Sequence, residues 1–391
     1  MEKEDEELLV TDMSSKRDVL VMIESSRESG RQLIAGLADY ARHFGPWNFH
    51  WHPLGLGSLE APLEGIKLDG MMVRDMAGVP ASIKAGVPAI DFTFSKAISK
   101  GAGWANTDDQ AVSKTIAEHF LQRGFRNFAY CGYKDRPWSI DRGKHFTAWL
   151  QKADYAVNNF WIPSDSWGGT DNLEIIQWLE SLPHRTALMA TNDDLGRRLV
   201  GLCQEADLRV PDDCAIIGVD NDPLICGMSN PPLSSVKIDQ YQAGYDAAAM
   251  LDKMMKGKPP KNLVVTAQVG ELIVRQSSDI IAVEDAAVSK ALRFIQQNAH
   301  RAVKVDEVAR ASGLFRRSLE RRFREHLSRS ISDYCREARA ERLEKILRET
   351  RLNLEEIAEQ SGFSEASHLT RFFITVRGES PSQYRKRVSL R

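Results

Sequence analysis

Short apolar runs alternate with amphipathic stretches from residue 18 to about residue 280. The clearest apolar runs are DVLVMI (18–23), FAYCGY (128–133), ALMA (187–190) and CAIIGVD (214–220). Helical stretches are expected near 29–43, from Thr107 or Asp108, from about 139 and from about 194. Strands that alternate with crossover helices form parallel, doubly wound sheets with helices on both faces. The pattern predicts an α/β region with two such sheets between residues 16 and 280.

A repeat occupies the last hundred residues. VDEVARASGLFRRSLERRF (305–323) and LEEIAEQSGFSEASHLTRFF (354–373) align with a shift of about 49 residues, and about 50 past the glycine. Each copy has a small residue, a glycine four residues later and a Leu/Phe pair, which are Ala309, Gly313, Leu319 and Phe323, then Ala358, Gly362, Leu369 and Phe373. Glycine adopts positive φ in a turn, and Leu and Phe at i, i+4 bury one helix face. The repeat therefore predicts two helix-turn-helix units in an all-α region.

The opposite face of each second helix carries residues that suit the major groove of DNA. These are Arg316, Arg317, Glu320 and Arg321 in the first copy, and Ala366, Ser367, His368 and Arg371 in the second. Arg322 lies one step around the helix and is expected to contact phosphate. The alternative is a helical bundle with solvated basic faces. Two copies with the same spacing disfavour that alternative.

The segment 288–391 resembles the AraC/XylS-type DNA-binding domain. The resemblance rests on GFSEASHLTRFF (362–373), GESPSQYR (378–385) and the linking-helix segment ARAERLEKILRET (338–350). The family usually has Ser or Thr as the N-cap of the first reading helix, where this chain has Phe315. A missing cap costs about 1 kcal/mol, so this helix is expected to start late or to be capped otherwise.

Residues 16–275 resemble the periplasmic-binding-protein-like core of LacI/GalR-type regulators. The resemblance rests on residues 191–224 (TNDDLGRRLVGLCQEADLRVPDDCAIIGVDNDPL), together with ANTDDQA, HFLQRGFRNFAYCG and NPPLSSVKID. It implies a two-lobed sensor whose chain crosses between the lobes near Asn106, Lys237 and Lys258. Residues 1–15 are expected to form a disordered tail, and 276–287 a linker. The order of the two domains resembles the xylose-operon regulators, and no LacI-type headpiece is expected before Arg17.

In the resembled fold, a ligand binds in the cleft between the lobes, beyond the carboxyl ends of the strands. The resemblance implies that Arg142, Asn192 with Asp193 beside it, and Asp220 contact a sugar there, with Trp138 and Arg31 as further candidates. Each has another interpretation. Asn192 and Asp220 suit turns at strand ends, Arg142 suits the surface, and Trp138 suits a core. Thr93 stands where sugar binders often carry an acid, which leaves the ligand's identity open.

The formal net charge of −2 hides an asymmetry between the two regions. Residues 288–391 contain 23 Lys or Arg against 14 Asp or Glu, and the remainder contains 29 against 40. The basic end coincides with the repeat, as expected for nucleic-acid binding. The acidic N-terminus does not resemble a signal peptide, and the five cysteines show no metal spacing. These features favour a cytoplasmic, nucleoid-associated protein.

The sequence predicts a transcription regulator that binds a double-stranded DNA operator as a homodimer and responds to a small sugar, with D-xylose first on resemblance. No nucleophile elbow, phosphate loop or metal-spaced His/Asp set is present in the sequence. We therefore expect no enzymatic activity, no cofactor and no metal. The first alternative is the same architecture with another sugar or metabolite. The second is a sugar-binding or sugar-handling protein whose helical tail does not read DNA.

Overall fold

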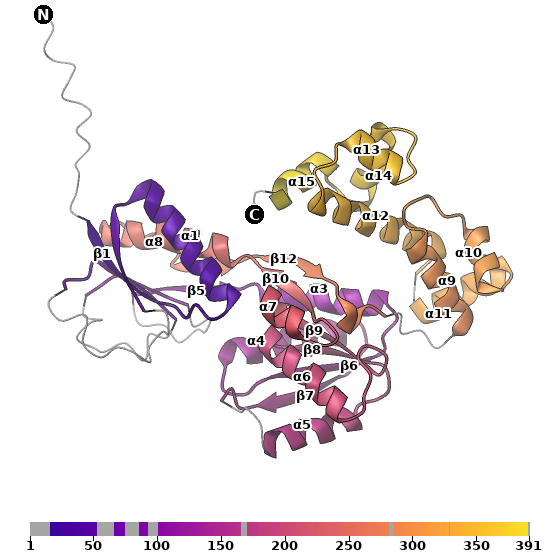
Figure 1. Ribbon diagram of the computed structural model, residues 1–391, viewed down its shortest axis with the longest axis horizontal. Helices are drawn as coiled ribbons and strands as arrows, with labels where there is room; N and C mark the ends of the chain where they lie inside the picture. Colours follow the sequence, from indigo (N-terminus) through magenta and orange to yellow (C-terminus); the bar gives the residue numbers. More distant parts are fainter. Residues whose placement is uncertain are drawn as a thin grey trace, which may run out of the picture.

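The computed structural model has two α/β lobes followed by a helical region (Figure 1). It describes residues 16–52, 66–74, 86–92, 101–165, 170–280, 285–327 and 329–389. The expected tail 1–15, the middle of the expected linker (281–284) and Thr93 lie outside the described residues. Among the described residues, no helix combines the length and the apolar character needed to span a membrane.

The first lobe contains a six-stranded parallel sheet in the order β11-β5-β4-β3-β1-β2. Its strands are β1 (Arg17–Met22), β2 (Trp47–Trp51), β3 (Gly70–Val73), β4 (Ala89–Asp91), β5 (Gly103–Thr107) and β11 (Val264–Ala267). Helices α1 (Glu28–Phe44) and α8 (Gln240–Met255) pack against each other on this lobe (Figure 1). A Cβ atom at Gly244 would lie 2.1 Å from the Leu33 carbonyl oxygen. This glycine therefore allows the close crossing of the two helices.

The second lobe contains the sheet β12-β10-β9-β8-β6-β7. Its strands are β6 (Asn127–Tyr133), β7 (Val157–Ile162), β8 (Thr186–Ala190), β9 (Cys214–Asp220), β10 (Ser234–Ile238) and β12 (Val269–Ile273). Its helices are α3 (Asp109–Gln122), α4 (Pro137–Gln151), α5 (Thr170–Ser181), α6 (Asp193–Glu205) and α7 (Pro223–Met228). All strand pairs are parallel except β10 with β12, which is antiparallel. The doubly wound α/β architecture is thus confirmed, with one reversed edge strand.

The chain crosses between the lobes at Asp108, Asp239 and Gln268. Asp108 and Asp239 each cap the helix that follows, since their carboxylates accept hydrogen bonds from Ala111 N (3.0 Å) and Gln242 N (3.1 Å). The predicted crossings near Asn106 and Lys237 agree with this. The prediction of a crossing near Lys258 was wrong, because the following strand β11 still pairs with β5 in the first sheet.

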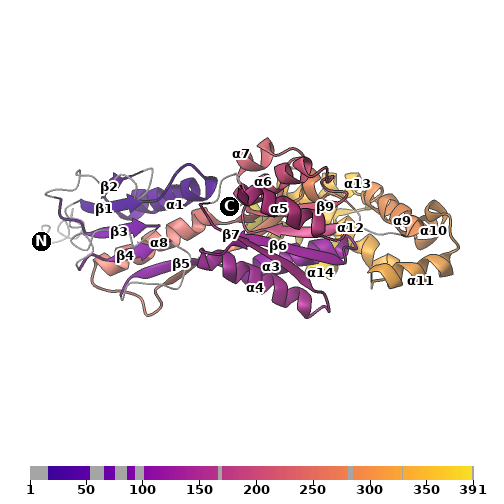
Figure 2. The same cartoon turned by 90° about the horizontal axis from the view of Figure 1, so that it is seen from below.

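The helical region contains two small cores on either side of a long helix, α12 (Ile331–Glu349). The first core includes α9 (Ala286–Gln297), α10 (Val305–Ser312) and α11 (Arg316–Leu327). The second includes α13 (Leu354–Gln360), α14 (Ala366–Arg377) and α15 (Pro381–Ser389). Figure 1 shows α13–α15 apart from the sheets, whereas in the view of Figure 2 this group of helices overlaps the second lobe.

Both predicted helix-turn-helix units are present. Leu319, Phe323, Leu369 and Phe373 are all fully buried. Gly313 and Gly362 have φ of +79° and +63°, the left-handed region that glycine tolerates. Helix α11 begins at Arg316, directly after Phe315, so the missing serine or threonine cap does not delay its start.

Both ends of the expected linker 276–287 belong to ordered structure. A short 3₁₀ turn, Gln276–Ser278, packs into the second lobe, where Ser277 is fully buried and donates to the Ile216 carbonyl (2.6 Å). At the other end, the Asp285 carboxylate caps α9 and accepts a hydrogen bond from Arg322 (2.9 Å).

Candidate functional site

A cavity of about 480 Å³ lies between the two lobes. Its residues from the first lobe are Glu24, Arg27, Ser29, Arg74, Phe92, Thr107 and Gln240. Its residues from the second lobe are Arg136, Pro137, Trp138, Arg142, Asn192, Asp193, Asp194, Asp220, Asp222 and Ile225. The cavity thus lies at the carboxyl ends of β6, β8 and β9, where open α/β sheets bind ligands. Of the six predicted ligand-binding residues, five line it and Arg31 does not.

Arg142, on α4, is held rigidly in the wall of the cavity. It is only 4% exposed, and its Nε donates to Asp109 Oδ1 (2.7 Å). A second nitrogen of the guanidinium donates to the Thr191 carbonyl. Burial opposes its charge, but Asp109 and Asp220 outweigh burial and raise the pKa of Arg142. The surface interpretation of this arginine is wrong.

Asn192 and Asp193 follow β8, and both side chains make hydrogen bonds within the second lobe. The Asn192 side chain caps α6 by accepting from Leu195 N (3.1 Å). Asp193 is 2% exposed and accepts hydrogen bonds from Asp222 N and Ser235 Oγ. Burial, reinforced by Asp220, raises the pKa of Asp193 well above its ordinary value. The capping interpretation of Asn192 is correct, and it is compatible with a place in the cavity wall.

Asp220 ends β9 with a φ of +107°, a strained conformation for a residue with a side chain. Burial raises the pKa of its carboxyl group to about 6, while Arg142 and Arg74 pull it back down. At neutral pH the carboxylate is therefore mostly ionised and accepts hydrogen bonds. A partly desolvated, strained carboxylate in a cavity is typical of a functional site.

Trp138, at the start of α4, packs against neighbouring side chains and also lines the cavity. It is half-buried, and its ring contacts the Tyr133 ring at 6.1 Å between centroids. The Arg142 guanidinium carbon lies 5.3 Å from the Trp138 ring centroid, within the range of a cation–π contact. The indole therefore packs on Arg142 and also lines the cavity.

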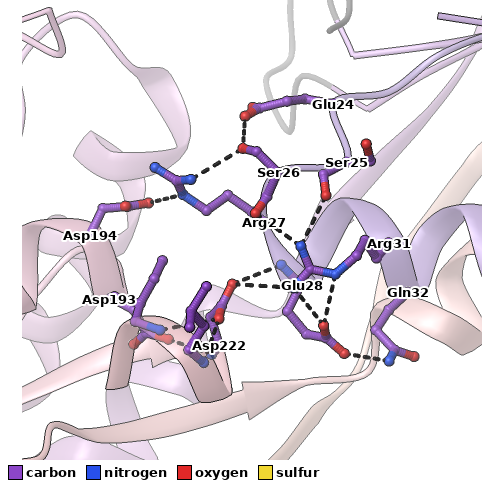
Figure 3. Close-up of polar contacts among 12 residues, drawn as sticks. Glu24, Ser25, Ser26, Arg27, Glu28, Arg31, Gln32, Asp193, Asp194 and Asp222 are labelled. Carbon is purple, nitrogen blue, oxygen red and sulfur yellow. Dashed lines mark hydrogen bonds and ion pairs between the residues drawn. The ribbon is translucent and has the colours of Figure 1, made fainter. Parts of the chain in front are cut away.

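Arg27 and Asp222 make contacts that join the lobes at the edge of the cavity (Figure 3). Arg27 Nε, in the first lobe, donates to Asp194 Oδ2 in the second (2.8 Å). Asp222 accepts from Glu28 N at the start of α1 (2.8 Å), while its other oxygen accepts from Leu224 N in α7 (2.9 Å). One carboxylate thus caps a helix in each lobe. Closure of the cleft therefore satisfies a backbone N–H group of the first lobe.

Arg31 does not line the cavity, and its guanidinium lies 3.9 Å from Asp222 Oδ2 of the second lobe, which is a further contact between the lobes (Figure 3). Its guanidinium binds the Glu28 carboxylate (2.9 Å) and the carbonyls of Ser25 and Ser26 (both 2.9 Å). Arg27, one helical turn earlier, lines the cavity instead.

Sequence reasoning also missed Gln240. This first residue of α8 is 5% exposed, lines the cavity, and its amide oxygen has no hydrogen-bond partner within the described part of the chain. The sequence feature that could have identified Gln240 is its position directly after the helix cap Asp239, where the chain crosses between the lobes. A buried amide oxygen without a partner lowers the stability of the folded state unless a ligand or a water molecule donates a hydrogen bond to it.

The predicted DNA-reading faces lie on the outside of the helical region. Arg316 pairs with Glu320 (2.9 Å) and Asp306 (3.3 Å), and Arg321 pairs with Glu325 (2.8 Å). Arg317 is exposed, and we find no ion pair for it in the ranges that the structure covers. These pairs are solvent-exposed and weak, so phosphate or base edges compete with them easily.

The second reading face has fewer arginines than the first, with Arg371 in place of Arg316, Arg317 and Arg321. Ser367 and His368 are exposed and make only local contacts, with Glu365 Oε2 (3.0 Å) and Ser364 Oγ (2.7 Å) respectively. Arg371 is exposed, and Ala366 is half-buried. In the first unit, Arg322 pairs with Asp285 (2.9 Å) and keeps 40% of its side chain exposed, and its contact with phosphate stays a prediction.

Comparisons with known proteins agree with this two-part architecture. A family model described as a periplasmic binding protein-like domain matches residues 117–278. A second, described as a helix-turn-helix domain, matches residues 308–387. The chain therefore combines a ligand-sensing fold with a DNA-binding fold.

Two curated relatives are xylose operon regulatory proteins. That of Haemophilus influenzae is 26% identical over 285 residues, covering 71% of this chain and 73% of the relative. That of Escherichia coli K12 is 27% identical over 286 residues, covering 71% of this chain and 72% of the relative. A solved structure titled as the xylose-binding transcription activator xylR superposes with a TM-score of 0.60 at 22% identity, covering 95% of this chain and 98% of that one. That likeness shows the shared fold.

Proposed function

Because this chain is a transcription regulator that joins a periplasmic-binding-protein-like domain to an AraC-type DNA-binding domain, we propose that a small sugar in the interlobe cleft controls it. The arrangement of Arg142, Asn192 and Asp220 around one cavity carries the proposal. A guanidinium, an amide and a carboxylate each bind neighbouring hydroxyl groups. D-xylose is the first candidate, because the relatives are named for the xylose operon.

In this proposal, the second lobe binds the sugar first and the first lobe closes on it. Arg142 donates to sugar oxygens, and the ionised Asp220 accepts from hydroxyl groups. Trp138 covers an apolar face of the ring. Gln240, from the first lobe, accepts a further hydroxyl hydrogen bond, which its unpaired amide oxygen favours. The ligand thereby adds to the two edge contacts that Arg27 and Asp222 make between the lobes.

Two contacts connect the second lobe to the helical region and support a route for coupling. Arg348 in α12 forms an ion pair with Glu271, which lies on β12 three residues after the crossing at Gln268. Arg126 donates to the carbonyl of His326 near the end of α11. A change at the hinge is transmitted through these contacts to both reading units.

We propose a sensor of residues 16–275, a linker of residues 276–287 whose two ends pack against the neighbouring domains, and a DNA-binding domain of residues 288–391. A homodimer would present two pairs of helix-turn-helix units to an operator whose half-sites are spaced by helical turns. The protein acts in the cytoplasm, at the nucleoid.

A thermal-shift panel of pentoses and hexoses tests the ligand. A sugar present at about 100 times its dissociation constant adds roughly 2.7 kcal/mol to the stability of the sensor. We expect D-xylose to give the largest shift. If another sugar gives it, the architecture stands and the ligand changes. If no sugar shifts the melting temperature, the sugar-sensing function is wrong.

A further inference from the structure

Phe315 is the most exposed large hydrophobic residue in the described part of the chain. Its exposed fraction is 89%, whereas the next, Met228, has 71%. It stands in the turn of the first helix-turn-helix unit, and its carbonyl accepts the hydrogen bond from Leu319 N (3.0 Å) that opens α11.

Stability does not explain a phenylalanine at this position. The side chain buries almost none of its apolar surface, and it cannot accept the capping hydrogen bond that serine or threonine would accept. Elsewhere in the same region, Ser330 caps α12 and Asn353 caps α13, whereas Glu365 at the start of α14 makes no capping hydrogen bond but is polar. A position that breaks a local rule with no structural compensation is typical of a functional site.

The surroundings of Phe315 are those of a DNA-contacting surface. Arg316 and Arg317 follow it directly and are exposed, and Arg321 follows one turn later with 67% of its side chain exposed. A helix-turn-helix unit presents the N-terminal residues of its second helix to base edges in the major groove. The phenyl ring therefore stands where the bases are expected.

The second unit has no aromatic residue at the place of Phe315, and its nearest one, the counterpart of Leu314, is covered. Phe363 follows Gly362 directly, and the Arg339 guanidinium covers its ring with its carbon 3.5 Å from the ring centroid. The next residue is Ser364, whose hydroxyl bonds to His368. The exposed phenyl ring is thus a property of the first unit.

We propose that Phe315 reads the 5-methyl group of a thymine in the major groove. Apolar contact with this methyl group is one of the ways in which side chains distinguish thymine from the other bases. The neighbouring arginines position the helix on phosphate and guanine, and Phe315 adds a preference that a polar residue at its position cannot provide. The proposal rests on DNA binding by the helical region and is independent of the sugar.

The test uses the full-length protein and a random duplex library. The wild type, Phe315→Ser and Arg317→Ala are each used to enrich binding sites. Phe315→Ser restores a capping side chain, so the helix is expected to fold at least as well as in the wild type. We expect the wild type and Arg317→Ala to enrich a thymine at one position where Phe315→Ser tolerates other bases.

The methyl group itself is then removed by replacing that thymine with deoxyuridine. Loss of one buried methyl group should weaken binding by the wild type and by Arg317→Ala about four-fold. Binding by Phe315→Ser should not change. As a control, deoxyuridine replaces a thymine in the part of the site that the second unit binds. This replacement should change the binding affinity equally in all three proteins.

Two results would overturn the proposal. An equal deoxyuridine penalty in the wild type and Phe315→Ser would show that the ring does not contact the methyl group. If the wild type enriches no sequence at all, the helical region does not read bases and the inference fails with that premise. A sugar panel without any thermal shift would count against the proposed effector alone.

Discussion

The arginines of the cleft and those of the reading helices occupy opposite environments. Arg142 is 4% exposed, and two groups far from it in sequence hold its guanidinium. Arg321 has 67% of its side chain exposed and pairs only with Glu325, one turn along the same helix. The first arrangement holds a guanidinium in a fixed position in the wall of a cavity. The second leaves charge available to a polyanion, because solvent-exposed pairs contribute little and exchange readily.

The largest effect expected from this difference is on stability. Arg142→Ala leaves the Asp109 carboxylate without its partner inside the second lobe, which costs about 3–5 kcal/mol. Arg321→Ala breaks an exposed pair and should cost less than about 1 kcal/mol. All eight tryptophans lie between residues 47 and 178, so their fluorescence during urea unfolding measures Arg142→Ala in the sensor, and far-UV circular dichroism measures Arg321→Ala in the helical region. Similar midpoints for Arg142→Ala and wild type would mean that the Arg142 pair is not buried.

The next effect is a pH dependence of stability that arises in the cleft. The folded sensor holds the pKa of Asp220 at about 6, above the ordinary value near 3.9. The folded state therefore binds more protons than the unfolded state in this window. Its stability falls as pH rises from 4 to 6, by roughly 3 kcal/mol in total from this group.

Asp220→Asn removes this contribution, although Asp193, whose pKa is also raised, keeps a slope of the same sign. The difference in unfolding free energy between the wild type and the variant, measured at several pH values, reports the contribution of Asp220 together with its effect on Asp193. The wild type should lose stability relative to Asp220→Asn between pH 4 and 6. A constant difference across that range would contradict the raised pKa.

On the reading faces, the expected effect is on base preference. Arg321→Ala and Arg371→Ala should each remove about 1–3 kcal/mol of discrimination at particular base pairs. Arg322 lies against Asp285 at the start of α9, so Arg322→Ala should leave preference unchanged. Binding of the three variants to a library of operator mutants distinguishes them. Relaxed preference in Arg322→Ala alone would mean that the helix presents a different face to DNA.

The smallest effect concerns the edge of the cleft. Asp222→Ala removes the carboxylate that caps α7 and the first turn of α1, at a cost of about 0.5–2 kcal/mol. Glu28→Ala keeps the backbone N–H group and serves as the matched control. If Asp222 joins the lobes, small-angle scattering should show a more open sensor for Asp222→Ala than for the control. Equal dimensions would mean that closure does not depend on this contact.

Local patterns were sufficient to predict much of the molecule. The strands ending at Ala190 and Asp220 and the glycine turns of the repeat depend on neighbouring residues, and the sequence displays them directly. The third crossing was misplaced because it depends on whether β11 pairs in the first or the second sheet. The Asp222–Glu28 contact joins residues 194 positions apart, and no local pattern reports it. Likewise, Gln240 gains significance only from the cavity that it lines.

The central claim is that occupancy of the cleft changes DNA binding by a surface that the ligand does not touch. The most direct measurement is the affinity of the full-length protein for a selected operator, with and without saturating D-xylose or the sugar that stabilises it most. Allosteric coupling predicts an affinity change of at least about five-fold in the wild type. Asp220→Ala should match the sugar-free wild type and fail to respond. Equal affinities in the wild type with and without a sugar that binds the sensor would contradict the account.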